Sequence, residues 1–360
     1  MVYKPTTVIG SFPDKPGEIN YVIDRQLRHG INIVCDGQLR CDMNIYFANT
    51  IEGFDVVSEK PVLNRKISGL KPKGLDILVS DLRMAQGRIA KNAYSKVYPV
   101  ELKANLTGPV TLGFSAVNSA PLGEEALKLY DGFYRTDKNN KVVNTRFWKD
   151  IGVAMGKIVK AYETMGVRHI QIDEPMVSAN KKSTIPMLEI ALAEIIGARK
   201  NRDTKFYMHS CGPIGQRYND FVKLEGIEAL SFEFAGTPSN LELISRESLE
   251  SNNKKLLLGI IKSNEPEPDD VLKEVYRGVT NDMYGGRYDD PELQAVLEPH
   301  INKCLEIYYA AAKKVGEENI LQINPDCGLG GFRQLGTKAT IAAVAKLRIL
   351  QEVQKRISER

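Results

Sequence analysis

The chain has few of the residues that would place it in several common protein classes. Among its 360 residues there are five cysteines, four histidines and one tryptophan. No cysteines stand in the compact double Cys-x-x-Cys arrangement that is typical of structural zinc sites. A metal site, if present, must therefore be assembled from residues far apart in the sequence.

Long apolar runs are also missing. No stretch is long enough to span a bilayer. The apolar run Thr6–Phe12 near the start is too short for the core of a secretory signal. We therefore expect a cytoplasmic protein without membrane contacts, in which the cysteines stay reduced unless they bind metal.

The charge is neither large nor concentrated. The formal net charge is +4, and basic residues occur only in short pairs such as Arg65-Lys66 and Lys181-Lys182. A nucleic-acid-binding protein usually gathers its positive charge on one face, so no nucleic-acid partner is expected. Hydrophobic residues make up 42% of the chain, enough for a sizeable core.

A repeating order of short apolar runs and longer amphipathic stretches indicates the fold. Such alternation implies parallel βαβ units, and eight of them in one domain length predict an α/β protein with a (β/α)8 TIM barrel. Several runs are apolar throughout, as expected for strands covered on both faces. The eight expected strands are Thr6–Ser11, Ile31–Asp36, Glu101–Leu106, His169–Asp173, Lys205–Ser210, Glu228–Phe234, Lys255–Ile261 and Ile320–Asn324.

Helical patterns fill most of the gaps between these runs. Two segments are too long for simple crossovers and are expected as excursions after strands two and three. They are Pro61–Lys96, with a helix near Asp81–Ala93, and Leu122–Val143. We expect residues 1–360 to form one domain. The expected helices are Asn144–Met165, Ile185–Arg199, Asp270–Gly278, Leu293–Lys314 and Gln334–Ile357.

Polar and small residues follow most of the expected strands, where a barrel of this kind builds its active site. His209 and Cys211 end strand five on one side of it, Glu233 ends strand six, and Cys327 follows strand eight. Imidazole, thiolate and carboxylate groups are zinc ligands, and zinc prefers four of them in a tetrahedron. A lone His-x-Cys is more often structural, but four such residues at strand ends favour a metal site.

The other three cysteines fit structural roles better. Cys35 lies inside strand two and Cys304 inside a helix, so both are expected as small buried apolar residues. Cys41 follows strand two near the expected active-site face, where a structural role is again favoured.

At its strand ends the sequence resembles the catalytic barrel of cobalamin-independent methionine synthase. The resemblance covers most of the chain, and IQIDEP and NPDCGL at their separation are its most specific parts. The family's long form has two barrels, and this chain resembles the second, as in short single-barrel members. The shared stretches are Ile9–Pro13, Asp42-Met43 with Tyr46-Phe47, Leu106–Val110, Ile170–Pro175, Met208–Cys211, Ser231–Glu233 and Asn324–Leu329.

The resemblance implies a zinc-dependent transferase that methylates the thiol of homocysteine to give methionine. It implies that zinc is held by His209, Cys211, Glu233 and Cys327. It also implies that Ser11 with the neighbouring backbone of Ile9 and Gly10, together with Asp173, holds the amino-acid end of homocysteine. Asp173 and Glu174 have a structural alternative, because Asp-Glu-Pro also suits the start of a helix.

The expected chemistry depends on activating a thiol. A free thiol has a pKa of about 8.5, so little of it is thiolate at neutral pH, whereas coordination to zinc deprotonates it. Glu233 is the weakest of the four candidate ligands, and we expect the substrate sulfur to displace it or a water. Asp173 and Glu233 are therefore the expected catalytic residues.

Three departures from the family pattern bear on the substrates. After strand two the family has a glutamate that contacts the substrate amine, and Gln38 takes its place among the expected substrate-binding residues here. A neutral amide can accept a hydrogen bond but gives no ion pair, so either Asp36 or Asp42 substitutes for the glutamate, or the acceptor thiol differs. After Leu106–Val110, long-form members have a tryptophan that stacks on the folate ring, whereas this chain has Leu112–Ser115. After strand seven they have a histidine thought to protonate the leaving folate nitrogen, whereas this chain has Ile261–Asn264 without a histidine.

The last two losses indicate a different methyl donor. A methyl group on a folate nitrogen leaves poorly unless that nitrogen is protonated. A methyl group on a corrinoid cobalt needs no proton donor. We therefore expect a methylated corrinoid protein, or another non-folate carrier, with Lys262 as a less favoured proton donor to folate.

Two other functions stay open at this point. One is a corrinoid-linked methyltransferase acting on another thiol, such as coenzyme M. The other is a non-catalytic zinc barrel that serves as an assembly partner. A glutamate ligand argues against the second, because structural zinc sites are usually closed by Cys and His alone.

Overall fold

A computed structural model describes residues 3–117, 128–130, 134–136, 141–143, 145–179, 184–283 and 291–360. The chain forms two compact units. Unit 1 comprises Met1–Leu39, Ala85–Glu101 and Ser231–Arg360, and unit 2 comprises Arg40–Met84 and Leu102–Leu230. The expectation of a single domain stays a prediction.

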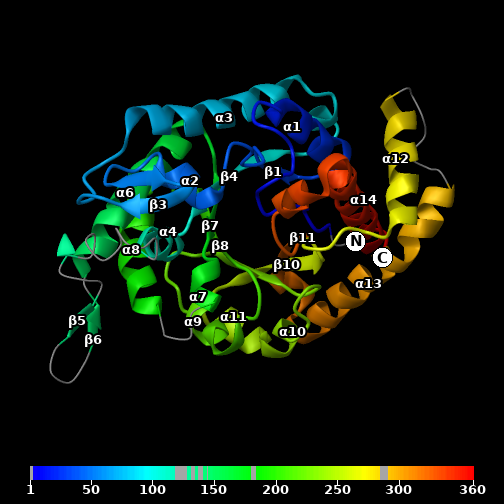
Figure 1. Ribbon diagram of the computed structural model, residues 1–360. Helices are drawn as coiled ribbons and strands as arrows, with labels where there is room; N and C mark the ends of the chain where they lie inside the picture. The colour runs from blue at the N-terminus through cyan, green and yellow to red at the C-terminus, as the bar shows by residue number, and fades with distance from the viewer. Residues whose placement is uncertain are drawn as a thin grey trace. The chain divides into compact units, whose positions relative to one another are not determined.

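Three parallel strands form the centre of unit 2. They are β4 (Glu101–Thr107), β7 (His169–Asp173) and β8 (Lys205–Ser210), which lie side by side in Figure 1. The register pairs Thr107 with Asp173 and Asp173 with His209. The C-terminal ends of all three strands therefore lie at one edge, as predicted for an active-site face.

These three strands alternate between polar and apolar residues, so they are not among the expected strands that are apolar on both faces. Leu106, Ile172 and Met208 are fully buried on one face. The opposite face carries buried polar or aromatic side chains at every second position. The members of that face are Lys103, Asn105, Thr107, His169, Gln171, Asp173, Tyr207 and His209.

Helices connect the strands of unit 2. They are α4 (Pro109–Val117), α6 (Thr145–Thr164), α7 (Pro175–Ala179), α8 (Ile185–Gly197) and α9 (Tyr218–Phe221), with a 3-10 turn at Gly215–Arg217. α6 and α8 pack closely because Gly152 lies against the backbone of Ala191, where a Cβ would be 2.6 Å from its carbonyl oxygen. Both helices confirm the sequence prediction.

The chain between the second and third expected strands has more structure than the sequence predicts. Before the predicted excursion, Pro61–Lys96, lie α2 (Met43–Ala48) and β2 (Phe54–Val57). β2 forms a hairpin with β3 (Lys60–Leu63), and α3 (Pro72–Lys91) follows. Ser58 and Glu59 have φ values of 49° and 59°, which is the backbone of a type I′ turn. The helix expected at Asp81–Ala93 is α3, which begins earlier, at Pro72, and ends at Lys91. A 3-10 turn at Tyr94–Lys96 follows it.

The second excursion, Leu122–Val143, lies mostly outside the described residues. Within it β5 (Tyr134–Thr136) pairs antiparallel with β6 (Lys141–Val143).

Unit 1 has its own parallel strands. β10 (Lys255–Ile261) pairs with β11 (Ile320–Pro325), and β9 (Ala229–Glu233) ends in this unit. Thr6 forms a parallel bridge with Ile323, and Thr7 another with Ile33 in β1 (Ile33–Val34). The expected first strand is thus reduced to two bridges, and the second to two residues.

Helices account for most of the remaining length of unit 1. The expected helices near Asp270, Leu293 and Gln334 are present. The last begins within a 3-10 segment, η4, which is kinked at the non-helical Gly336, and continues as a regular helix. The elements are α1 (Ile19–Arg28), α10 (Asn240–Leu243), α11 (Arg246–Ser251), α12 (Asp269–Met283), α13 (Pro291–Val315), a 3-10 turn at Glu317–Asn319, η4 (Leu329–Lys338) and α14 (Ala339–Ser358).

The strand order confirms the predicted fold class. Seven strands follow the order β1-β4-β7-β8-β9-β10-β11, and the bridges of Thr6 and Thr7 place the N-terminal segment between β11 and β1. Eight members in this cyclic order, separated along the chain by helices, give the topology of a (β/α)8 barrel. Within the described residues, every helix is too short or too polar to cross a membrane.

Candidate metal centre and substrate site

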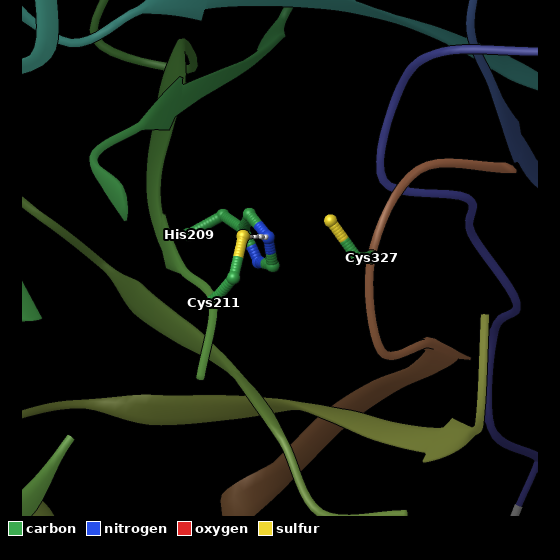
Figure 2. A group of neighbouring side chains, drawn as sticks. All are labelled: His209, Cys211 and Cys327. Carbon is green, nitrogen blue, oxygen red and sulfur yellow. Dashed lines mark hydrogen bonds between the residues drawn. The ribbon is translucent and has the colours of Figure 1, made fainter. Parts of the chain in front are cut away.

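The end of β8 brings two candidate metal ligands together in unit 2. His209 is the fifth residue of the strand, and Cys211 follows its last residue. The Nε2 atom of His209 lies 3.2 Å from the Sγ atom of Cys211 (Figure 2). The imidazole is buried and the thiol half-buried, so the pair is shielded but reachable. Figure 2 also draws Cys327, which belongs to unit 1.

Asp173, the predicted substrate residue at the end of β7, is held in place by two amides. Its Oδ1 accepts a hydrogen bond of 2.6 Å from Gln171 Nε2, and its Oδ2 one of 3.1 Å from Asn105 Nδ2. Burial raises the pKa of the Asp173 carboxyl, while the nearby His209 and these two amides act in the opposite direction. Its hydrogen-bond donors are side-chain amides and not the backbone N–H groups of a helix start, so these contacts do not support a helix-capping role for Asp173.

Glu174, by contrast, is a helix cap. Its carboxylate accepts hydrogen bonds from the backbone N–H groups of Val110 and Thr111, at 2.8 and 3.0 Å, and from the Thr111 hydroxyl at 2.7 Å. These donors belong to the first turn of α4, where a negative charge is favoured. The predicted alternative, a helix-capping role, is thus right for Glu174. The helix that Glu174 caps is α4, however, and not α7, which follows Glu174 in the chain.

The same carboxylate explains the glycine of LTGPV. A Cβ at Gly108 would lie 2.1 Å from Cδ of Glu174, so only glycine fits there. Burial raises the pKa of Glu174 to about 7. Its backbone N–H donates to the carbonyl oxygen of His209 at 2.8 Å, which ties this cap to the strand end that carries the ligand pair.

In unit 1, Glu233 is the last residue of β9 and is half-buried. Its Oε2 accepts a hydrogen bond of 3.2 Å from the Thr237 hydroxyl, and its backbone carbonyl accepts one of 2.8 Å from Asn240 Nδ2. The turn after β9 therefore orients this candidate ligand from both its side chain and its backbone.

Asp326 is a site residue that our reasoning from the sequence missed. It is 2% exposed, and its carboxylate accepts hydrogen bonds from three successive backbone N–H groups, those of Phe234, Ala235 and Gly236. Burial, reinforced by the charge of Glu233, raises its pKa to about 7. Its position inside NPDCGL was the available signal, but the three donors come from a loop about 90 residues away in the chain.

Cys327 follows Asp326 and is half-buried. Its backbone N–H donates to the Ser263 hydroxyl at 2.8 Å, so the loop after β10 fixes the backbone of this candidate ligand. The predicted substrate residue Ser11 lies against the segment that follows Cys327, where the Leu329 N–H donates to its carbonyl oxygen at 2.7 Å. A Cβ at Gly328 would be 2.4 Å from its Oγ, and one at Gly330 2.6 Å. Unit 1 thus places Ser11 beside the segment that carries Cys327.

The other predicted substrate residues, Ile9, Gly10 and Gln38, belong to unit 1 and lie in or just after the first two expected strands. Ile9 is buried, and the Gly10 carbonyl accepts a hydrogen bond of 3.1 Å from the Cys35 thiol. Gln38 is 8% exposed and has a φ of 45°, an uncommon value for a residue with a side chain. Its backbone N–H donates to Asp36 Oδ1 at 3.2 Å.

The two possible substitutes for the missing glutamate differ in their contacts. Asp36 is buried and bonded to Gln38, whereas Asp42 caps α2 by accepting a hydrogen bond of 2.8 Å from Asn44 N–H. Asp42 therefore has a structural role of its own.

Cys35 and Cys304 are buried, as predicted, and Cys41 is half-buried. Burial raises the pKa of the Cys304 thiol to about 12, so that thiol is inert.

The donor types suit zinc. One imidazole, two thiols and a carboxylate match the mixed nitrogen, sulfur and oxygen sets of catalytic zinc sites. The contacts described above hold the backbone segments of Glu233 and Cys327 in place.

Comparisons with known proteins place the chain in a family. The family described as "Cobalamin-independent synthase, Catalytic domain" matches residues 15–269. The chain belongs to this family. The predicted resemblance is therefore confirmed.

Curated relatives include proteins matched over nearly their whole length and longer proteins matched over less than half of it. The methionine synthase of Methanothermobacter thermautotrophicus is 27% identical, over 95% of this chain and 97% of the relative. The methionine synthase of Methanocaldococcus jannaschii is 28% identical, over 90% and 92%. The 5-methyltetrahydropteroyltriglutamate–homocysteine methyltransferase of Coxiella burnetii is 28% identical over 90% of this chain, but the match spans only 39% of that longer protein.

A solved structure supports the same fold. The B12-independent methionine synthase of Shewanella sp. W3-18-1, in complex with selenomethionine, has a TM-score of 0.62 at 18% identity, over 100% of both chains.

Proposed function

We propose that this member of the cobalamin-independent synthase family is a zinc-dependent methyltransferase that converts homocysteine to methionine. The observation that carries the proposal is the donor set at the strand ends, with His209 against Cys211 in unit 2, and Glu233 and the loop of Cys327 both bonded to neighbouring turns in unit 1. The names of the archaeal relatives agree with this activity.

The proposed zinc ligands are His209, Cys211, Glu233 and Cys327. Three of them, His209, Cys211 and Cys327, make up a group that could hold a metal ion. A bound zinc ion would supply the positive charge that lowers the pKa of a thiol from about 8.5 into the physiological range. Glu233 is the ligand that we expect to be exchangeable, because carboxylates complete catalytic rather than structural sites.

The amino-acid end of homocysteine is assigned to Asp173 and Ser11. Asp173 is buried, and a carboxylate in a dry site forms a strong charge-assisted hydrogen bond with an ammonium group. Ser11, with the backbone of Ile9 and Gly10, lies on the loop that packs against Gly328 and Gly330. Holding the substrate in one orientation contributes several kcal/mol to catalysis.

We further propose that the methyl donor is a methylated corrinoid protein or another non-folate carrier. Trp148, the only tryptophan in the sequence, is fully buried and packs against Phe114 and Phe147, so it offers no ring for a pterin to stack on. Lys262, the possible proton donor after β10, forms an ion pair of 2.8 Å with Glu265. The Coxiella burnetii relative, by its name, uses a pterin donor, so the two donors must be compared directly.

The test combines metal analysis with a two-donor assay. The purified protein is analysed for zinc by mass spectrometry and then supplied with homocysteine and either methylcobalamin or methyltetrahydropteroyltriglutamate. We expect about one zinc per chain and methionine formation from methylcobalamin only. Efficient turnover with the pterin donor alone would contradict the donor assignment but leave the methyltransferase proposal intact.

A thiol panel tests the acceptor. Homocysteine and coenzyme M are compared with methylcobalamin as donor, because Gln38 leaves the choice of thiol open. Faster methylation of coenzyme M would move the assignment to another thiol. A protein that binds zinc but methylates neither would favour the non-catalytic barrel.

A further inference from the structure

Unit 2 buries a lysine that the proposed chemistry does not use. Lys103 lies in the middle of β4 with 0% of its surface exposed. An ammonium group loses several kcal/mol of hydration when it is buried, so it persists only where other groups compensate its charge. A lysine kept in such a place therefore calls for a functional explanation.

A chain of hydrogen bonds leads from this lysine to the predicted substrate residue. Lys103 Nζ donates to Gln171 Oε1 at 2.6 Å, and Gln171 Nε2 donates to Asp173 Oδ1, also at 2.6 Å. Gln171 is fully buried as well. The three side chains come from adjacent parallel strands and share one face, because positions two apart along a strand point the same way.

The direction of each hydrogen bond in this chain is fixed by Lys103. An ammonium group can only donate, so the amide of Gln171 must present its oxygen to Lys103. Its NH2 group must then face Asp173 and donate. Without the lysine, the amide could rotate by 180° and present its oxygen to the carboxylate, which would repel it.

Asp173 receives its second amide donor from Asn105, which binds the other oxygen at 3.1 Å. A carboxylate can accept about four hydrogen bonds, so these two leave capacity for a ligand. Both oxygens are thereby held from the strand side, and the carboxylate cannot turn freely about its own bond.

We propose that Lys103 and Gln171 are positioning residues that orient Asp173 toward the ammonium group of the amino-acid substrate. Lys103 also places a positive charge on the far side of Gln171, which compensates the buried negative charge of Asp173 in the absence of ligand. The inference rests on the proposed function, because it takes homocysteine as the ligand of Asp173.

The test measures homocysteine and an analogue without the amino group. Lys103→Met keeps the length of the side chain but removes the donor. We expect the KM for homocysteine to rise about tenfold or more, as for a lost hydrogen bond to a charged group, with a smaller change in kcat. With 4-mercaptobutanoate, which has the thiol and carboxylate but no ammonium, the variant and the wild type should have the same KM.

A second variant covers the case in which Lys103→Met does not fold. Gln171→Met interrupts the same chain without removing a charge and should show the same selective rise in KM. Lys205→Met is a matched control, because Lys205 lies in the same sheet, on β8 next to β7, and its side chain is exposed. Zinc content and circular dichroism are measured for all three variants.

The outcomes separate this inference from the function on which it rests. If the wild type methylates homocysteine and both variants keep its KM, the positioning role is wrong and the proposed function stands. A rise in KM that is equal for homocysteine and 4-mercaptobutanoate would also overturn the positioning role. If the wild type contains zinc but does not bind homocysteine, the proposed function fails, and the positioning role fails with it.

Discussion

Glu174 in unit 2 and Asp326 in unit 1 follow strands β7 and β11 and are almost wholly buried. Each accepts three hydrogen bonds from a segment distant in the chain. Burial raises the pKa of both carboxyl groups to about 7. The partners differ. Glu174 binds the first turn of α4, whereas Asp326 binds an irregular turn that begins next to the candidate ligand Glu233.

The different partners of the two carboxylates predict different roles, stabilising the fold for Glu174 and positioning a candidate metal ligand for Asp326. A carboxylate at a helix start satisfies N–H groups that every helix leaves unpaired, so Glu174 mainly stabilises the fold. The turn held by Asp326 has no helical ladder, so the carboxylate itself determines where the backbone beside Glu233 runs. We therefore expect changes at Glu174 to affect unfolding and changes at Asp326 to affect the metal.

The largest effects should come from removing one candidate ligand from each unit. Cys211→Ala and Cys327→Ala should each lose zinc and lower turnover by about three orders of magnitude or more, because both thiolates would be direct ligands. Zinc content and initial rates are measured together. Cys41→Ala, a half-buried cysteine that is not a proposed ligand, is the control and should retain both. Turnover by a zinc-free Cys327→Ala protein would refute the scheme.

The next largest effects should come from the glycines that make room for the two carboxylates. A Cβ at Gly108 would lie 2.1 Å from Glu174, and one at Gly259 would lie 2.5 Å from the Phe232 carbonyl oxygen and 2.8 Å from Asp326. Gly108→Ala and Gly259→Ala should each lower the free energy of unfolding by about 1–3 kcal/mol or more. Urea denaturation measures this.

Gly87→Ala is the matched control for these two variants. Gly87 lies in α3 with nothing near its Cβ position, so alanine should raise the free energy of unfolding by about 0.5–1 kcal/mol. If Gly108→Ala were as stable as Gly87→Ala, the close packing of Glu174 would be wrong.

A smaller effect is expected when one carboxylate of the pair loses its charge. Asp326→Asn should weaken zinc binding about 10- to 100-fold, because residues that hold a metal ligand from behind usually have effects of that size. Glu174→Gln should leave zinc affinity close to that of the wild type. Competition with a chromophoric chelator measures both, and equal losses in the two variants would remove the functional distinction between the units.

The smallest effect concerns pH. The folded pKa of Glu174, about 7, lies above its ordinary value of 4.5, so its stabilising contribution is complete below about pH 4.5 and lost as the pH rises through 7. Glu174→Gln has no proton to lose. Its free energy of unfolding should fall less steeply over this interval than that of the wild type, by at most about 1.4 kcal/mol per pH unit.

Urea unfolding of the zinc-free proteins at several pH values measures this difference. Parallel pH profiles for the wild type and Glu174→Gln would show that Glu174 keeps an ordinary pKa in the folded protein.

Local sequence pattern predicted the regular elements well where pattern and packing agree. The bounds of β7, β8 and β10 agree with the sequence prediction because apolar residues recur along each run, alternately or without a break, and turn residues follow it. The β2–β3 hairpin was missed because its turn residues, Ser58 and Glu59, lack the Asn-Gly or Asp-Gly signal of a type I′ turn. The expected first strand, Thr6–Ser11, is represented by two isolated bridges, at Thr6 and Thr7, because strand pairing depends on packing that the residue pattern does not show.

The sequence by itself determined the order of strands and helices, the candidate ligands His209, Cys211, Glu233 and Cys327, and the family. Chemical identity and alternation along a strand are local properties, so they can be read from the chain. Only the tertiary structure decided that Glu174 caps α4, that Asp326 holds the turn after β9 and that Lys103 is linked through Gln171 to Asp173. Each of these is a contact between segments 60 or more residues apart, and such contacts arise from strand pairing and packing.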